Sequence, residues 1–160
     1  THLAGAAGTV TGAALTRLIG GKTDIVMMLN GALAGLVAIT AEPLTPGPIT
    51  AMIIGSIGAV IMYYGTKLLE NFGLDDVVGA IPVHMFAGIF GTLVVPLTNA
   101  DTSFGTQLIG VISVCVFSFV LSWITFSTLK STVGLRISRA AEKQGTDKAE
   151  VGVIAYSIRD

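Results

Sequence analysis

Charged residues are scarce in this sequence. Asp, Glu, Lys and Arg make up only 12% of its 160 residues, against roughly 25% in soluble domains. The formal net charge is -1, so no excess of basic residues favours binding to nucleic acid. The one cysteine, Cys115, has no partner for an intrachain disulfide and no metal-ligand spacing, and we interpret it as a small packing residue.

Enzyme signatures are also missing. The sequence shows no nucleophile paired with a base, no cluster of metal ligands and no phosphate-binding loop. We therefore predict that the protein is not an enzyme. We expect no catalytic residue, no metal and no cofactor.

The few charges leave five long uncharged runs. A membrane-spanning helix needs about 20 mainly apolar residues, with a range of roughly 17 to 25. We therefore predict an all-α integral membrane protein with five transmembrane helices and no soluble domain. The uncharged runs are residues 1–16, 25–41, 43–66, 77–100 and 102–129. The predicted spans are residues 1–19, 25–41, 48–68, 77–97 and 105–129, in a membrane region 1–130 that a tail, 131–160, follows.

The beginning of the chain is unusual for a membrane protein. It starts inside an apolar stretch, with no initiator Met and no basic segment ahead of it. Those features do not match a signal peptide. We expect the sequence to be the C-terminal part of a longer polypeptide.

Connections with and without positive charges alternate along the predicted chain. The connections after the second and fourth spans, residues 42–48 and 97–101, carry no lysine or arginine. Lysine and arginine occur only in the last residues of the first and third spans or after the first, third and fifth spans: Arg17, Lys22, Lys67, Lys130, Arg136, Arg139, Lys143, Lys148 and Arg159. The positive-inside rule makes that side cytoplasmic. We predict a cytoplasmic tail and a fourth helix that runs from inside to outside. One merged or missed helix would break the alternation of basic and non-basic connections on which this prediction rests.

One ionisable residue, His84, lies in the middle of the fourth predicted span. Such a group is costly to bury at membrane depth and usually faces a bundle interior or a transport path. His84 is therefore either a packing residue bonded to a neighbouring helix or part of a pore. The rest of the chain favours the pore.

Two residues near His84 also allow two interpretations. Pro82 lacks an N–H and leaves the carbonyl near Val78 without its helical donor; that carbonyl is structural or lines a path, and we favour the structural role. Asp76 precedes His84 by eight residues, which is about 12 Å along a helix. Asp76 is either a helix cap or a group at the mouth of the pore, and we favour the cap.

Glycines recur at close spacing in the first four predicted spans. Close packing of membrane helices depends on small residues. We predict packing positions at Gly8, Gly12, Gly31, Gly35, Gly55, Gly58, Gly88 and Gly91. A tight bundle of this kind is typical of a channel or transporter and not of a single-helix anchor.

Four motifs, in order along nearly the whole chain, resemble ammonium transporters of the Amt family. They comprise residues 30–41, 74–84, 87–93 and a tail motif, 132–138, with 145–147 and 155–156 after it. Residues 42–46 resemble bacterial members. The resemblance implies a fold of eleven helices, ten of them in an inverted five-plus-five repeat. This chain would supply the second part of that fold, helices seven to eleven.

The resemblance implies transport of ammonium or ammonia, with methylammonium as an analogue, through a histidine-lined apolar pore. His84 would be the second histidine of a pair whose partner lies outside this chain. An ion is costly to desolvate in such a pore, whereas ammonia is less costly and can hydrogen-bond to imidazole. A pore histidine that takes a proton from ammonium would distinguish it from potassium, because potassium has no proton to lose. Whether ammonia moves alone or with a proton stays open.

The resemblance also bears on other residues. Asp76 falls on an acidic position with a structural role in the family. The outer aromatic site and the phenylalanine gate belong to helices outside this chain, so we interpret Trp123 as a lipid-facing or packing residue. Many members have Gly where this chain has Met85, and Ala87 also replaces a frequent Gly. In one interpretation both changes affect only packing. In the other, Met85 narrows the vestibule of the pore or is typical of a variant that acts as a sensor.

The implied partners are the lipid membrane, two further copies in a homotrimer of the full-length protein, and a PII signalling protein at the cytoplasmic face. The implied location is the inner (plasma) membrane, with multiple passes. Two alternatives to transport stay open. In the first alternative, the chain belongs to an ammonium sensor on the same fold. In the second, it is an inactive membrane fragment.

Overall fold

The computed structural model describes residues 1–155. Tyr156 and Arg159, which the sequence analysis used, lie outside the described residues. Every regular element within 1–155 is a helix, and no strand is present there. In order they are α1 (His2–Gly20), α2 (Ile25–Thr40), α3 (Pro48–Asn71), the π-helix η1 (Ile81–Phe86), α4 (Ala87–Val94), the 3-10 helix η2 (Val95–Leu97), α5 (Phe104–Thr132), α6 (Arg139–Gln144) and the π-helix η3 (Asp147–Val151).

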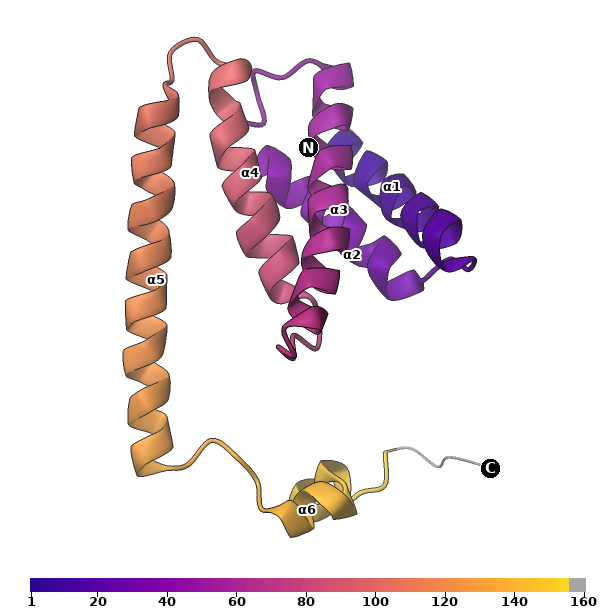
Figure 1. Ribbon diagram of the computed structural model, residues 1–160, viewed down its shortest axis with the longest axis vertical. Coiled ribbons are helices and arrows are strands. Elements are labelled where there is room, and N and C mark those ends of the chain that lie inside the picture. Colours follow the sequence, from indigo (N-terminus) through magenta and orange to yellow (C-terminus); the bar gives the residue numbers. More distant parts are fainter. Residues whose placement is uncertain (156–160) are drawn as a thin grey trace. The chain divides into compact units, whose positions relative to one another are not determined.

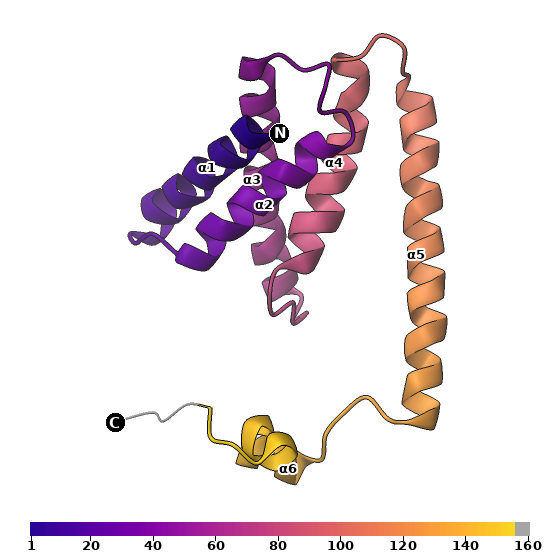
Figure 2. The same ribbon diagram turned by 180° about the vertical axis from the view of Figure 1, so that it is seen from behind.

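The chain divides into two units, Thr1–Val114 and Cys115–Asp160. In the first unit α1 and α2 lie side by side and both contact α3, while η1 and α4 pack against α2 and α3 (Figures 1 and 2). Two clusters of buried residues hold this unit together. One joins α1, α2 and α3 through Ala4, Ala38, Ile39, Ala51 and Ile54. The other joins α2 and α3 to the helix of His84 through Ala34, Met62, Val83 and Ala87.

Glycines bring the backbones of α1 and α2 into close contact. A Cβ atom on Gly31 would lie 2.6 Å from the carbonyl oxygen of Gly8, and one on Gly12 would lie 2.8 Å from that of Met27. Neither site has room for a side chain, because the obstructing atoms are backbone. Gly88 differs, because a Cβ there would meet only Val37 Cγ1, at 3.6 Å. The predicted close packing is therefore confirmed along the α1–α2 contact but is not required at Gly88.

The helix of His84 begins later than predicted. The span expected at 77–97 is helical only from residue 80, because residues 76–79 form a turn. The N–H of Gly79 donates to the carbonyl oxygen of Asp76 over 3.1 Å, and Gly79 has a φ of 73°. That left-handed conformation suits glycine and interrupts a right-handed helix. The helix thus starts three residues after residue 77, the approximate start of the predicted span.

Two described helices, α3 and α5, are long and apolar enough to cross a membrane by themselves. Ile25–Thr40 and Ile81–Leu97 are shorter apolar helices. The all-helical architecture agrees with the prediction. Five membrane spans stay a prediction.

The connections between helices fall into two groups. Lys22 and Asp24 of the α1–α2 connection share a cavity of about 330 Å³ with Lys67 near the end of α3. In the other group, the side-chain amide of Asn99 donates to the carboxylate of Glu42 over 3.2 Å. The basic connections of the first unit thus lie together, and so do the two connections without lysine or arginine.

In the second unit, α6 and η3 form the described part of the tail. The hydroxyl of Ser138 caps α6 by accepting from the N–H of Ala141 over 3.2 Å. Asp147 accepts a 2.9 Å hydrogen bond from the N–H of Ala155 through Oδ2. That bond and one from the N–H of Lys148 lower the pKa of Asp147. Local hydrogen bonds therefore order the tail up to Ala155.

Candidate functional site

Asp76 builds the start of the helix that carries His84. Its Oδ1 accepts from the N–H of Ala80 over 2.9 Å, and its Oδ2 accepts from the N–H of Ile81 over 2.8 Å. The first N–H groups of a helix lack partners inside the helix, and a carboxylate satisfies them and complements the helix dipole. Asp76 thus caps the helix across the turn at residues 77–79.

Pro82 is buried almost completely at the first turn of η1. A Cβ atom on Gly65 of α3 would lie 3.3 Å from Pro82 Cβ, so the ring packs directly on α3. The carbonyl of Val78, in the turn before the helix, accepts a 3.0 Å hydrogen bond from Nδ2 of Asn30 in α2. The contacts around Pro82 are thus structural contacts to α2 and α3.

His84 lies on the opposite side of this helix from the core. Val83 and Ala87 are 1% and 0% exposed and pack against α2 and α3. His84 is exposed, and so are its neighbours on the same face, Ile81 at 39% and Met85 at 47%. Within the unit Thr1–Val114 the helices leave the imidazole exposed. His84 is therefore not part of the buried cluster that contains Val83 and Ala87.

A small acidic cavity lies at the start of the same helix. Its volume is about 200 Å³, and its lining includes Glu70, Asp75, Asp76 and Pro82. Both oxygens of Asp76 already accept backbone hydrogen bonds, and Glu70 pairs with Lys67 over 3.1 Å. Among the described residues no group of three or more His, Cys, Asp or Glu side chains is placed to hold a metal ion. The structure gives this cavity no metal site.

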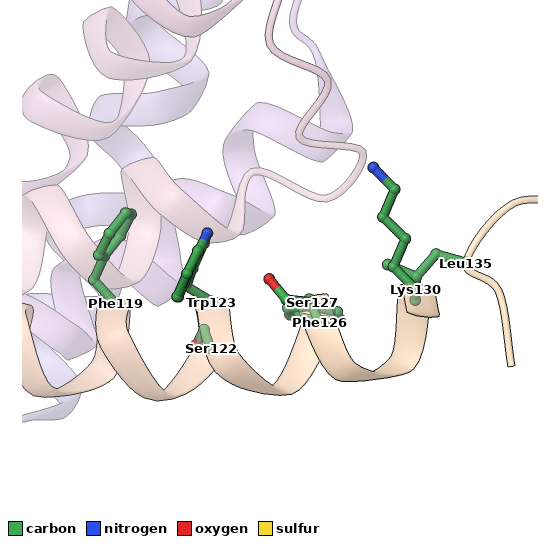
Figure 3. A pocket seen from close by; sticks show the side chains of 7 residues that line it. All are labelled: Phe119, Ser122, Trp123, Phe126, Ser127, Lys130 and Leu135. Atoms are coloured by element: carbon green, nitrogen blue, oxygen red, sulfur yellow. The ribbon is translucent and has the colours of Figure 1, made fainter. Parts of the chain in front are cut away.

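An apolar groove of about 300 Å³ lies elsewhere, in the second unit. The side chains of Phe119, Trp123 and Ser127 project from one side of α5, and Lys130 and Leu135 meet at its end (Figure 3). Trp123 is 65% exposed. The groove contains neither His84 nor Asp76 nor Pro82, so it is separate from the candidate site.

Comparison with known proteins decides the family. The sequence profile of the Ammonium Transporter Family matches residues 1–156. The chain belongs to this family. It is 41% identical to ammonium transporter Amt2 of Archaeoglobus fulgidus, across 98% of this chain and 38% of that protein. It is 32% identical to an ammonium transporter of Corynebacterium glutamicum, across 99% of this chain and 38% of that protein.

Solved structures share the arrangement of helices. One described as a sensor Amt protein superimposes with a TM-score of 0.85 at 30% identity, covering 92% of this chain and 40% of that one. Mep2 of Candida albicans superimposes with a TM-score of 0.79 at 26% identity, covering 94% of this chain and 38% of that one. The chain therefore spans less than half the length of the family members that it matches.

The sequence analysis missed one residue of the site region, Asn30. It appeared there only within the family motif 30–41. A signal was present, because Asn30 is the one carboxamide in the uncharged run 25–41. Its proximity to the carbonyl of Val78 was not readable from sequence.

Proposed function

We propose that this chain forms one wall of a pore that carries ammonium or ammonia across a membrane. The observation that carries the proposal is the exposed imidazole of His84, flanked by the exposed Ile81 and Met85 on a helix whose other face buries Val83 and Ala87. An ionisable residue with apolar neighbours fits a bundle interior or a transport path better than a lipid-facing surface. Another part of a longer protein would cover this face.

The chemistry of imidazole suits the proposed substrate. A neutral imidazole has one nitrogen that accepts a hydrogen bond and one that donates. Such a group accepts a proton from ammonium or bonds to ammonia, while apolar neighbours keep the ion's desolvation cost high. Potassium has no proton to lose. His84 would therefore favour ammonium over potassium, with Asp76 and Pro82 holding its helix in place.

The proposed setting follows from the family and the charges. The chain would contribute five membrane spans and a cytoplasmic tail, as the C-terminal part of an eleven-helix protein in the plasma membrane. The grouping of its connections supports this orientation, because Lys22 and Lys67 lie together and Glu42 lies with Asn99. A homotrimer and a PII protein at the cytoplasmic face remain further proposals on family grounds.

A second function is an ammonium sensor on the same scaffold. The likeness to a solved sensor Amt protein favours it, and so does Met85, an exposed side chain beside His84. A sensor binds its ligand without moving it at a useful rate. An inactive fragment is the third possibility, because one wall does not enclose a pore.

Uptake of radiolabelled methylammonium into vesicles separates these functions. The full-length protein, this 160-residue chain and empty vesicles would be compared at equal protein. We expect saturable uptake by the full-length protein and none by the chain alone. Saturable binding without uptake by the full-length protein would contradict transport and support a sensor. Absence of both binding and uptake would contradict both.

A further inference from the structure

The carbonyl group of Val78 has a donor that the helix itself cannot supply. Val78 lies in the turn before the helix, because the N–H of Val83 makes a helical hydrogen bond to the carbonyl of Gly79, over 3.1 Å. The Val78 carbonyl is therefore outside the hydrogen-bond pattern of the helix. The side-chain amide of Asn30 donates to it, with Nδ2 3.0 Å from the Val78 oxygen.

Asn30 also lies directly on the turn that leads into the helix. A Cβ atom on Gly79 would come within 2.7 Å of Asn30 Nδ2. Gly79 is buried and has a φ of 73°. The amide therefore holds the turn at Val78 and contacts the backbone at Gly79, immediately before the first helical residue.

The position of Asn30 on α2 is itself fixed. The next residue, Gly31, packs against the backbone of Gly8 and Gly12 in α1, with no space for a side chain. Asn30 is half-buried beside this contact. A donor attached to a tightly packed helix pair holds its acceptor more firmly than one attached to a loop.

The acceptor lies close to His84 along the chain. Val78 precedes His84 by six residues, or about 9 Å at the rise of an α-helix. Residues 81–86 between them form a π-helix, and single π-turns often occur at functional sites. A shift of the turn at Val78 would therefore move or rotate the helix segment that carries the imidazole.

We propose that Asn30 is a positioning residue for His84. Its amide holds the carbonyl of Val78 in the turn before the helix, and so sets where the imidazole lies on the exposed face. The inference rests on the proposed pore function of His84. Asn30 needs no contact with the substrate for this role.

The test measures methylammonium uptake per assembled full-length protein, together with the ratio of methylammonium to potassium transport. A net hydrogen bond of roughly 1 kcal/mol predicts a loss of about fivefold in uptake for Asn30→Ala. Asn30→Asp has nearly the same shape, but its ionised carboxylate cannot donate, so we expect a loss at least as large. Asn99→Ala, which removes a hydrogen bond to Glu42 in a different connection, is the matched control with unchanged uptake.

A lower amount of assembled protein with an unchanged transport ratio in Asn30→Ala would overturn the proposal, since that result indicates a purely structural role.

His84→Ala separates this inference from the proposed function. Unchanged uptake and selectivity in His84→Ala would refute the pore role, and with it the role of Asn30. Impaired transport in His84→Ala with normal transport in both Asn30→Ala and Asn30→Asp would refute only the positioning role.

Discussion

The side-chain amide of Asn99 donates a 3.2 Å hydrogen bond to the carboxylate of Glu42, 57 positions earlier in the chain. Glu42 also accepts from the N–H of Leu44 over 3.2 Å. One carboxylate thus joins the α2–α3 connection to the α4–α5 connection. The pair fixes these connections on the same side of the bundle.

Removal of this link should lower stability and leave transport intact. A hydrogen bond to a charged group contributes roughly 1.5–3 kcal/mol, and less where water competes. We predict that Asn99→Ala lowers the thermal midpoint of the detergent-solubilised full-length protein by a few degrees. Uptake per assembled protein should stay within error of the wild type. A midpoint unchanged from the wild type would show that the link contributes nothing.

Asp76→Ala tests the cap on the helix of His84. Loss of a helix cap costs about 0.5–2 kcal/mol, and here two backbone N–H groups lose their acceptors. We predict a lower thermal midpoint and less assembled protein, measured by size-exclusion chromatography. Asp76→Asn should be milder because it keeps one acceptor oxygen.

Asp75→Ala is the control for this prediction, since Asp75 is the exposed neighbour of Asp76. It should leave both measurements unchanged. A stable assembly of Asp76→Ala with altered conduction would favour the pore-mouth interpretation over the cap.

Gly91→Ala tests the contact between α4 and α2. A Cβ on Gly91 would lie 2.8 Å from the Cα of Ala38, inside the range that real Cβ atoms avoid. Overpacking of this kind costs typically about 1–3 kcal/mol, so we predict a loss of assembled protein. Gly20→Ala is the matched control, because nothing lies within 4 Å of a Cβ at Gly20. Equal yields of the two variants would contradict a packing constraint between Gly91 and Ala38.

Asp147 should make the tail sensitive to acid. The N–H of Ala155 bonds to its carboxylate and lowers its pKa from the ordinary value of 3.8. A group with a lowered folded pKa stabilises the folded tail above its unfolded pKa, and that contribution is lost as pH falls through the folded pKa. We predict that the amide NMR signal of Ala155 is constant near neutral pH and shifts in acid, with a midpoint below the ordinary carboxyl value of 3.8.

Asp147→Asn provides the comparison for the tail. Asparagine does not titrate, so the acid-induced shift of the Ala155 signal should disappear. A shift that persists in this variant would show that another group controls the local structure.

The uncharged runs predicted the helices well because the length of an apolar run can be counted directly from the sequence. The runs indicated α2 and α3, and the structure extends these helices over Ile25–Thr40 and Pro48–Asn71. The start of the helix of His84 was misplaced because Val77 and Val78 read as apolar helix. The cause is the turn at Gly79, whose positive φ depends on backbone contacts that composition does not reveal.

The candidate site was predicted only in part. Sequence reasoning singled out His84, Asp76 and Pro82, and it identified the carbonyl near Val78 as short of a donor. It could not identify Asn30 as that donor, because the pairing joins positions 48 residues apart. Nor could it show that His84 is exposed while Val83 is buried, since both lie in one uncharged run and tertiary packing alone decides which face is covered.

The central claim is tested most directly by His84→Ala in the full-length protein, with methylammonium and potassium transport measured in the same vesicles. His2→Ala, at the only other histidine of this chain, is the control and should behave like the wild type. We predict that His84→Ala inserts and assembles but loses selective methylammonium transport, by a slower rate or by admission of potassium. Normal methylammonium uptake with potassium still excluded would contradict the assignment of His84 to the pore.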